Sequence, residues 1–105
     1  MQTFRILHAK PMNYFGELTP EQVHNYKEVA QIRAADLNDA WVRSQNDFND
    51  VYAALGIRST SVGDIILPVN DSGRPETAML IAGVGFTAVP DVYWDIIKQN
   101  LVEYA

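Results

Sequence analysis

The stretch 64-DIILPVNDSGRPETAMLIAG-83 decides the fold of this chain. Two apolar runs, residues 64–69 and 76–83, flank the segment NDSGRP, whose residue types all favour tight turns. Short apolar runs that are separated by turn residues are typical of paired strands. The stretch therefore predicts a β-hairpin whose connection is the segment at residues 70–75.

Further strands are expected on both sides of this hairpin. Residues 3–9 (TFRILHA) alternate loosely and are rich in strand-forming residues. Residues 24–34 (HNYKEVAQIRA) alternate more regularly, which is typical of a strand with two different faces. The faces expected for that strand are Tyr26, Glu28, Ala30, Ile32 and Ala34 on one side, and Lys27, Val29, Gln31 and Arg33 on the other. Residues 85–90 (GFTAVP) can add a short strand or edge.

Helix-start residues mark two helical segments between these strands. In residues 18–23 (LTPEQV), Thr19 is the expected N-cap of a short helix. In residues 35–46 (ADLNDAWVRSQN), Asp36 is the expected N-cap. Its apolar residues Leu37, Ala40 and Trp41 share one face, and we expect this face to pack into the core.

Two more helices complete the pattern. Residues 47–57 (DFNDVYAALGI) have apolar side chains at helical spacing between Asp47 and a C-capping Gly56. A last helix begins at Pro90 and continues to the final residue. The resulting order, β-β-α-α-β-β-(β)-α, predicts an α+β fold in which helices pack on one face of a mainly antiparallel sheet of four to five strands. We expect residues 1–105 to form a single domain.

The composition restricts the class of protein. With 48% hydrophobic and 20% charged residues, the chain has the composition of an ordinary globular domain. It contains no cysteine, which excludes disulfides, thiolate nucleophiles and cysteine zinc sites. The first residues lack the layout of a signal peptide, and no apolar run approaches the roughly 20 residues of a bilayer span. A soluble, cytoplasmic protein without a membrane partner is the expectation.

The charge distribution bears on the kind of partner. The formal net charge is −5, and eight cations are scattered along the chain without a run, which argues against direct nucleic-acid binding. Four aspartates lie close together in sequence: Asp36, Asp39, Asp47 and Asp50. They form either a solvated face or an acidic face for a basic protein partner.

Motifs for cofactors and catalysis fail in context. Residues 83–88 match a dinucleotide-binding glycine pattern, but the following helix begins only at Pro90, so these glycines are expected to permit a bend between strands. His8 and His24 have no neighbouring ligand at metal spacing and are expected at exposed or strand-edge positions. No G-x-S-x-G motif supports a serine nucleophile. We therefore expect no cofactor, no metal and no catalytic residue.

Three aromatic residues stand apart from the helical stripes. Tyr14 and Phe15 lie in a segment with Pro and Gly, and Trp94 falls beside the apolar stripe of the last helix. Exposed aromatic side chains of this kind are typical interface anchors. They are candidates for contacts with a partner protein or with a second copy of the chain.

The segment 58-RSTSVGD-64 concentrates polar residues between a helix end and a strand start. Its hydroxyl groups can satisfy loose backbone groups, Gly63 permits a positive φ, and Asp64 can turn its carboxylate back onto the loop amides. The same residues could instead form a nest for an anion. That candidate ligand loop comprises Arg58, Ser59, Ser61 and Asp64.

This segment also has a family resemblance. The chain from about Tyr26 to Val89 resembles the YodL-like domains and related small proteins of bacteriophages and conjugative elements. The matching residues are Asp36-Leu37 with Ala40-Trp41, Gln45-Asn46, Arg58 to Ile66, and Gly85-Phe86. The resemblance implies an accessory protein of a mobile element inside a bacterial host, and some relatives lie within large polyvalent proteins thought to counter host defences.

The expected function is therefore binding rather than catalysis. The leading hypothesis is a small non-enzymatic protein that binds another protein, such as a basic host nuclease or restriction component. One alternative is an anion- or nucleotide-binding domain that uses the Arg58–Asp64 loop. Another is a structural or assembly protein that forms oligomers.

Overall fold

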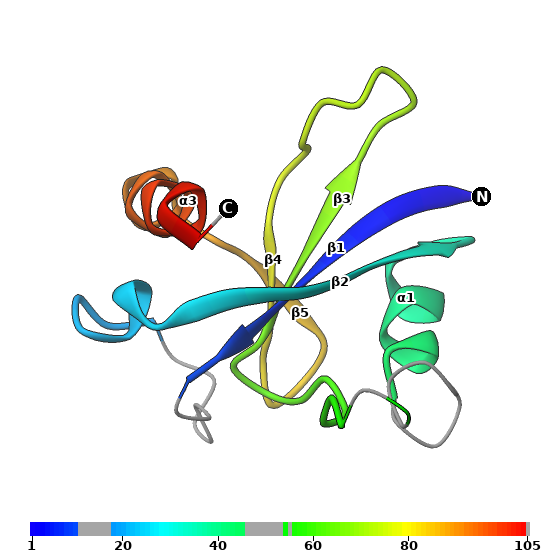
Figure 1. Ribbon diagram of the computed structural model, residues 1–105, viewed down its shortest axis with the longest axis horizontal. Coiled ribbons are helices and arrows are strands. Elements are labelled where there is room, and N and C mark those ends of the chain that lie inside the picture. Colours follow the sequence, from blue (N-terminus) through cyan, green and yellow to red (C-terminus); the bar gives the residue numbers. More distant parts are fainter. Residues whose placement is uncertain (11–17, 46–53, 55, 105) are drawn as a thin grey trace.

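The computed structural model describes residues 1–10, 18–45, 54 and 56–104, and these form an α+β fold (Figure 1). Its centre is a five-stranded antiparallel sheet with the strand order β2-β1-β3-β4-β5. The strands are β1 (Gln2–Ala9), β2 (Tyr26–Ala34), β3 (Ile65–Val69), β4 (Met79–Ile81) and β5 (Phe86–Ala88). The helices are the 3-10 turn η1 (Gln22–His24), α1 (Leu37–Arg43) and α3 (Asp91–Tyr104).

The predicted hairpin is confirmed as β3 and β4, which pair antiparallel. Its turn is held by the Asn70 side chain, whose Oδ1 accepts hydrogen bonds from the Ser72 and Arg74 amides at 3.0 and 2.9 Å. The predicted strands at 3–9, 24–34 and 85–90 correspond to β1, β2 and β5. Of the helix predicted at residues 47–57, residues 47–53 and 55 lie outside the described residues.

The two helices lie on opposite faces of the sheet, so the prediction that all helices share one face is wrong (Figure 1). On β3, Ile65 belongs to the core that contains Ile97 of α3, whereas the adjacent Ile66 belongs to the core that contains Ala40 of α1. Adjacent residues of a strand point to opposite faces. The continuous apolar run of β3 therefore indicates a strand that is buried on both faces.

A β-bulge on β2 changes which face its side chains point to. Ile6 and Leu7 are consecutive on β1, but their partners on β2 are two residues apart, which leaves Val29 as the extra residue. As a result, Tyr26 packs in the α3-side core and Ile32 packs against the α1-side core. The prediction that both residues share one face is wrong, because uniform alternation does not continue through a bulge.

The glycines at residues 83–85 form the turn between β4 and β5, as predicted. Gly85 has a φ of +72°, and its carbonyl accepts a hydrogen bond from the Ala82 amide at 3.0 Å. The longest helix of the described residues is α3, with 14 residues. Within that described part of the chain, no helix has the length and apolar character that a membrane crossing requires.

Candidate functional site

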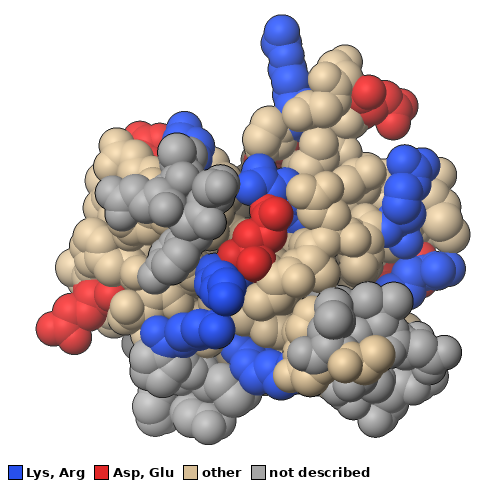
Figure 2. Space-filling model, in the orientation of Figure 1, with Lys and Arg blue, Asp and Glu red and all other residues tan. Residues whose placement is uncertain are grey.

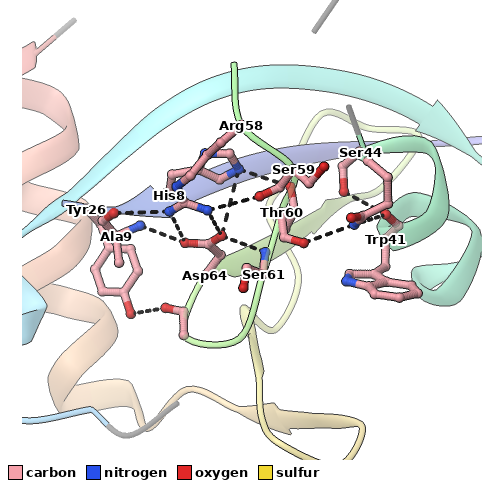
Figure 3. Close-up of polar contacts among 12 residues, drawn as sticks. His8, Ala9, Tyr26, Trp41, Ser44, Arg58, Ser59, Thr60, Ser61 and Asp64 are labelled. Atoms are coloured by element: carbon pink, nitrogen blue, oxygen red, sulfur yellow. Dashed lines mark hydrogen bonds and ion pairs between the residues drawn. The ribbon is translucent and has the colours of Figure 1, made fainter. Parts of the chain in front are cut away.

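A buried carboxylate, that of Asp64, organises the loop before β3 (Figure 3). The Arg58 guanidinium donates two hydrogen bonds to it, from Nη1 to Oδ2 at 2.7 Å and from Nη2 to Oδ1 at 2.8 Å. The backbone amides of Ala9 and Ser61 donate one each, both at 2.8 Å. Four donors therefore surround this one side chain. The prediction that Asp64 turns back onto the loop amides is confirmed.

We refer to Asp64, Arg58 and the backbone groups bonded to them as the Asp64 cluster. This cluster connects segments that are distant in sequence. Arg58 also donates to the carbonyl oxygens of Ala9 at 3.1 Å and of Ser59 at 3.0 Å. Gly63 has a φ of +90°, as predicted for this loop, and its carbonyl accepts a hydrogen bond from the Tyr26 hydroxyl. The end of β1, the start of β2 and the loop before β3 are thus joined at one point.

His8 lies in the interior beside this cluster, with only 2% of its surface exposed. Its Nε2 is 3.0 Å from the Thr60 hydroxyl and 3.9 Å from Asp64 Oδ2. Burial lowers the pKa of His8 to about 4, although the nearby Asp64 charge acts in the opposite direction. The expectation of an exposed or strand-edge histidine is wrong for His8, because β1 is an inner strand of the sheet. It is confirmed for His24, which is exposed.

The geometry around His8 gives no catalytic relay. A nucleophile–histidine–acid triad uses the two ring nitrogens for different partners. Here the hydroxyl of Thr60 and the carboxylate of Asp64 both lie on the Nε2 side. Thr60 is itself buried, with 2% of its surface exposed. Among the described residues, no group of three or more His, Asp or Glu side chains could hold a metal ion.

The anion site predicted in the 58–64 loop is occupied by a carboxylate of the protein itself, that of Asp64. The Arg58 guanidinium and the Ser61 amide, which an external anion would need, both donate to Asp64. An external phosphate would have to displace that carboxylate or approach its negative charge. Arg58, Ser61 and Asp64 are thus brought together, but in an internal ion pair.

The loop is also fastened to the C-terminal end of α1. The Thr60 amide donates to the Ser44 carbonyl at 3.1 Å, and the Gln45 side chain donates to the Thr60 carbonyl at 2.9 Å. Ser44 Oγ and Gln45 Nε2 both donate to the Trp41 carbonyl, at 2.8 and 2.9 Å. These bonds fix the helix end that carries the Trp41 side chain relative to the loop.

A groove of about 450 Å³ lies where α1, this loop and the β4–β5 turn meet. Its lining comprises Asn38, Trp41, Gln45, Ser59, Thr60, Ser61, Val62, Ile81, Ala82, Gly83, Gly85 and Phe86. Trp41 is 38% exposed, and Val84, between two lining glycines, is 95% exposed. Figure 3 shows the Trp41 indole on the side of α1 that faces the loop. We refer to this feature as the Trp41 groove.

Sequence reasoning missed this groove. It placed Trp41 with Leu37 and Ala40 on a core-facing stripe, but Ala40 alone of these three is fully buried. The helix is only seven residues long, so its packed face is narrow and the neighbouring Trp41 reaches the surface. The available signal was the family resemblance, since Trp41 and the 58–66 segment belong to the same set of matching residues.

The predicted acidic face is only partly described. Asp36 is the N-cap of α1 and accepts a hydrogen bond from the Asp39 amide at 2.8 Å. Asp39 accepts hydrogen bonds from the Ala35 amide at 2.8 Å and from Arg43 at 2.9 Å. Both bonds lower the pKa of Asp39, and the bond from Ala35 has the larger effect. Both aspartates thus have local structural partners. Asp47 and Asp50 lie outside the described residues.

The candidate interface aromatics are similarly divided. Tyr14 and Phe15 lie outside the described residues. Trp94 is half-buried and packs against the core on the α3 side of the sheet. It also lines a shallow groove together with Asp91 and Lys98. Trp94 therefore contributes to packing as well as to the surface.

Comparison with known proteins adds no relative. No family model, no curated protein and no solved structure matches this chain. The kinship with YodL-like domains therefore stays a prediction from the sequence.

Proposed function

We propose that this chain is a small, non-enzymatic binding protein, and that the Trp41 groove receives an apolar side chain from an extended segment of a partner protein. The observation that carries this proposal is an exposed tryptophan on a groove whose walls are fixed by hydrogen bonds. Tryptophan is among the residues that contribute most to binding at protein interfaces.

The lining of the groove supports a peptide as the occupant. Val62, Ile81 and Phe86 supply apolar contacts. Gln45 offers only its Oε1, since its Nε2 donates to the Trp41 and Thr60 carbonyls, whereas Asn38 supplies a carboxamide. A carboxamide can both donate to and accept from a peptide backbone. Among the described residues that line the groove, none is charged, which disfavours a phosphate or nucleotide ligand. The volume is within the range of sites that bind small ligands or side chains.

The hydrogen bonds of the 58–64 loop also support this proposal, because they hold the wall of the groove in place. Asp64 and Arg58 hold the loop against β1, and Thr60 with Gln45 holds the loop against α1. A groove that is already formed in the free protein binds with a smaller loss of conformational entropy than one that must be ordered. The segment that resembles YodL-like domains would then serve as the support of the binding site.

The class of partner follows from the resemblance alone. If the kinship with mobile-element proteins holds, the partner is a protein of the bacterial host, such as a nuclease or restriction component. The groove is a better recognition site than the predicted acidic face, because Asp36 and Asp39 are already used to cap and brace α1. The buried, hydrogen-bonded state of His8 favours binding over catalysis.

A peptide selection tests the proposal. Random twelve-residue peptides are selected on the wild-type protein, with counter-selection on a Trp41→Ala variant. Because the chain has two tryptophans, Trp94→Phe leaves Trp41 as the only indole fluorophore. We expect the selected peptides to share an apolar anchor and to shift the Trp41 emission to the blue. Trp41→Ala should weaken their binding by roughly thirtyfold, the effect of a typical hot spot.

Val42→Ala is the matched control, because Val42 is exposed to a similar degree on the same helix but does not line the groove. Its affinity for the selected peptides should equal that of the wild type. The proposal fails if no peptide is enriched over the Trp41→Ala background, or if the two variants lose affinity equally.

A further inference from the structure

The outer edge of β2 is the longest strand edge of the sheet. β2 is an end strand of the sheet order and, with nine residues, the longest strand. Among the described residues, β1 is the only strand that pairs with it. In an antiparallel pair, alternate residues direct their backbone N–H and C=O groups away from the partner strand. Such an edge is a template for pairing with another strand.

The charges along this edge are cationic although the chain as a whole is acidic. Lys27 and Arg33 are exposed side chains near opposite ends of β2, and Lys10 follows β1 close to Lys27. None of these three forms an ion pair with a residue that the structure describes. The only acid within β2, Glu28, is already paired with Arg5. The edge therefore has uncompensated positive charge.

The fold brings Lys10 and Lys27 together from separate parts of the sequence. Figure 2 shows the side of the molecule on which β2 crosses in front of the other strands in Figure 1, and Lys and Arg side chains are spread across this face. A groove of about 460 Å³ lies over β1 and β2, and its lining includes Lys10, Lys27 and Glu28. Arg58 also lines it, but its charge is paired with Asp64. Sequence alone shows scattered cations, because the β1–β2 register that joins them is not local.

We propose that the β2 edge binds an acidic, extended segment of a partner protein, which adds to the sheet as a sixth strand. An edge strand supplies backbone hydrogen bonds to a peptide, and alternate side chains of the peptide give specificity. The bulge at Val29 places Lys27 on the α1 side of the sheet and Arg33 on the α3 side, since Lys27 pairs with His8 and Arg33 with Thr3. A peptide with carboxylates on both of its faces would therefore lie with one carboxylate near each cation, and opposite charges on neighbouring strands stabilise the pair. This surface is distinct from the Trp41 groove, and the proposal does not depend on it.

Other occupants fit the edge less well. A second copy of the chain would bring Lys10, Lys27 and Arg33 of both copies to one seam, and like charges across strands are destabilising. Cationic side chains are also a common protection of edge strands against self-pairing. A nucleic acid matches the charge but offers no strand backbone to the exposed N–H and C=O groups.

The proposal is tested with the full chain and the peptide EVEVVEVEV, whose carboxylates change from one face to the other at its centre. Amide hydrogen exchange, followed by NMR, maps its binding on the protein. We expect slower exchange at alternate residues of β2 and an affinity that falls as salt increases. The peptides KVKVVKVKV and EVEVPEVEV are the controls, since the first reverses the charge and proline in the second removes a backbone donor while keeping every glutamate. Neither control should protect β2.

Charge reversal at the β2 edge is the second test of the proposal. Lys27→Glu with Arg33→Glu should weaken EVEVVEVEV binding about tenfold or more, because two favourable cross-strand pairs, one on each face, become repulsive. Arg74→Glu with Lys98→Glu is the matched control: it changes the net charge by the same amount on residues of the β3–β4 turn and α3. This control should keep most of the affinity.

Several results would overturn the proposal. One is protection from amide exchange outside β2, and another is an equal loss of affinity in both double variants. A dimer of the free protein joined through β2 would favour a second copy as the occupant. A single-stranded oligonucleotide that binds as tightly as the acidic peptide would favour a nucleic acid. Peptides that bind at the Trp41 groove are recognised by the Trp41 emission. The two proposals therefore succeed or fail separately.

Discussion

Replacing Asp64 by asparagine tests the buried cluster most directly. The substitution preserves the shape of the side chain but removes its charge and turns one of its two oxygens into a donor NH₂ group. In the wild type each carboxylate oxygen accepts one bond from Arg58 and one from a backbone amide, of Ala9 or of Ser61. In either orientation, asparagine therefore directs a donor at two other donors.

The magnitude follows from the burial of the two partners. Breaking a buried ion pair by removing one partner costs about 3–5 kcal/mol when the remaining charge stays buried. The Arg58 side chain is 31% exposed, so its guanidinium can turn toward water and recover part of this loss. We therefore expect Asp64→Asn to lower the free energy of unfolding by about 3 kcal/mol.

Urea unfolding at neutral pH measures this loss against a matched control. Arg43→Met breaks a surface pair, Arg43–Asp39, and should cost only about 0.5 kcal/mol. A complementary Asp64→Ala variant leaves the four donors around an empty space. Added formate should therefore stabilise that variant and leave the wild type unchanged. A cost for Asp64→Asn that is no larger than that of Arg43→Met, or a wild type that responds to formate equally, would refute the role given to Asp64.

Two further predictions concern pH and helix capping. The pKa of His8 is lowered to about 4 in the folded protein, so the unfolded chain takes up a proton at a higher pH than the folded chain does. The stability that neutral His8 contributes is therefore complete above about pH 6.5. As the pH falls toward 4, the free energy of unfolding should decrease by about 3 kcal/mol in total. Urea unfolding between pH 7 and 4 should show this loss in the wild type and a clearly shallower one in His8→Gln; parallel curves would contradict it. Asp36→Ala should cost about 1 kcal/mol and Asp36→Asn much less, and equal thermal unfolding temperatures for the two would exclude the capping role.

The features that sequence predicted well are those that local chemistry decides. The hairpin connection at residues 70–75 has turn residues, and Asp36 has the side chain and the position of an N-cap. Gly63 and Asp64 likewise act within their own loop. In each case the deciding contacts lie within a few residues of one another.

The features that sequence missed depend on contacts between distant segments. His8 is buried because β1 became an inner strand, and nothing near residue 8 specifies the strand order. The bulge at Val29 arises from the pairing of β2 with β1, since β2 considered alone alternates without interruption. The exposure of Trp41 likewise depends on which narrow face of α1 meets the sheet.

The Asp64 cluster has a consequence for how this chain responds to its redox environment. It joins Ala9 to Arg58 and Asp64, which are 49 and 55 residues away along the sequence. Closing a long loop in this way is what a disulfide does in many small secreted domains. This chain has no cysteine, so the closure is made by hydrogen bonds and charge alone. Reductants and oxidants should therefore leave this closure intact.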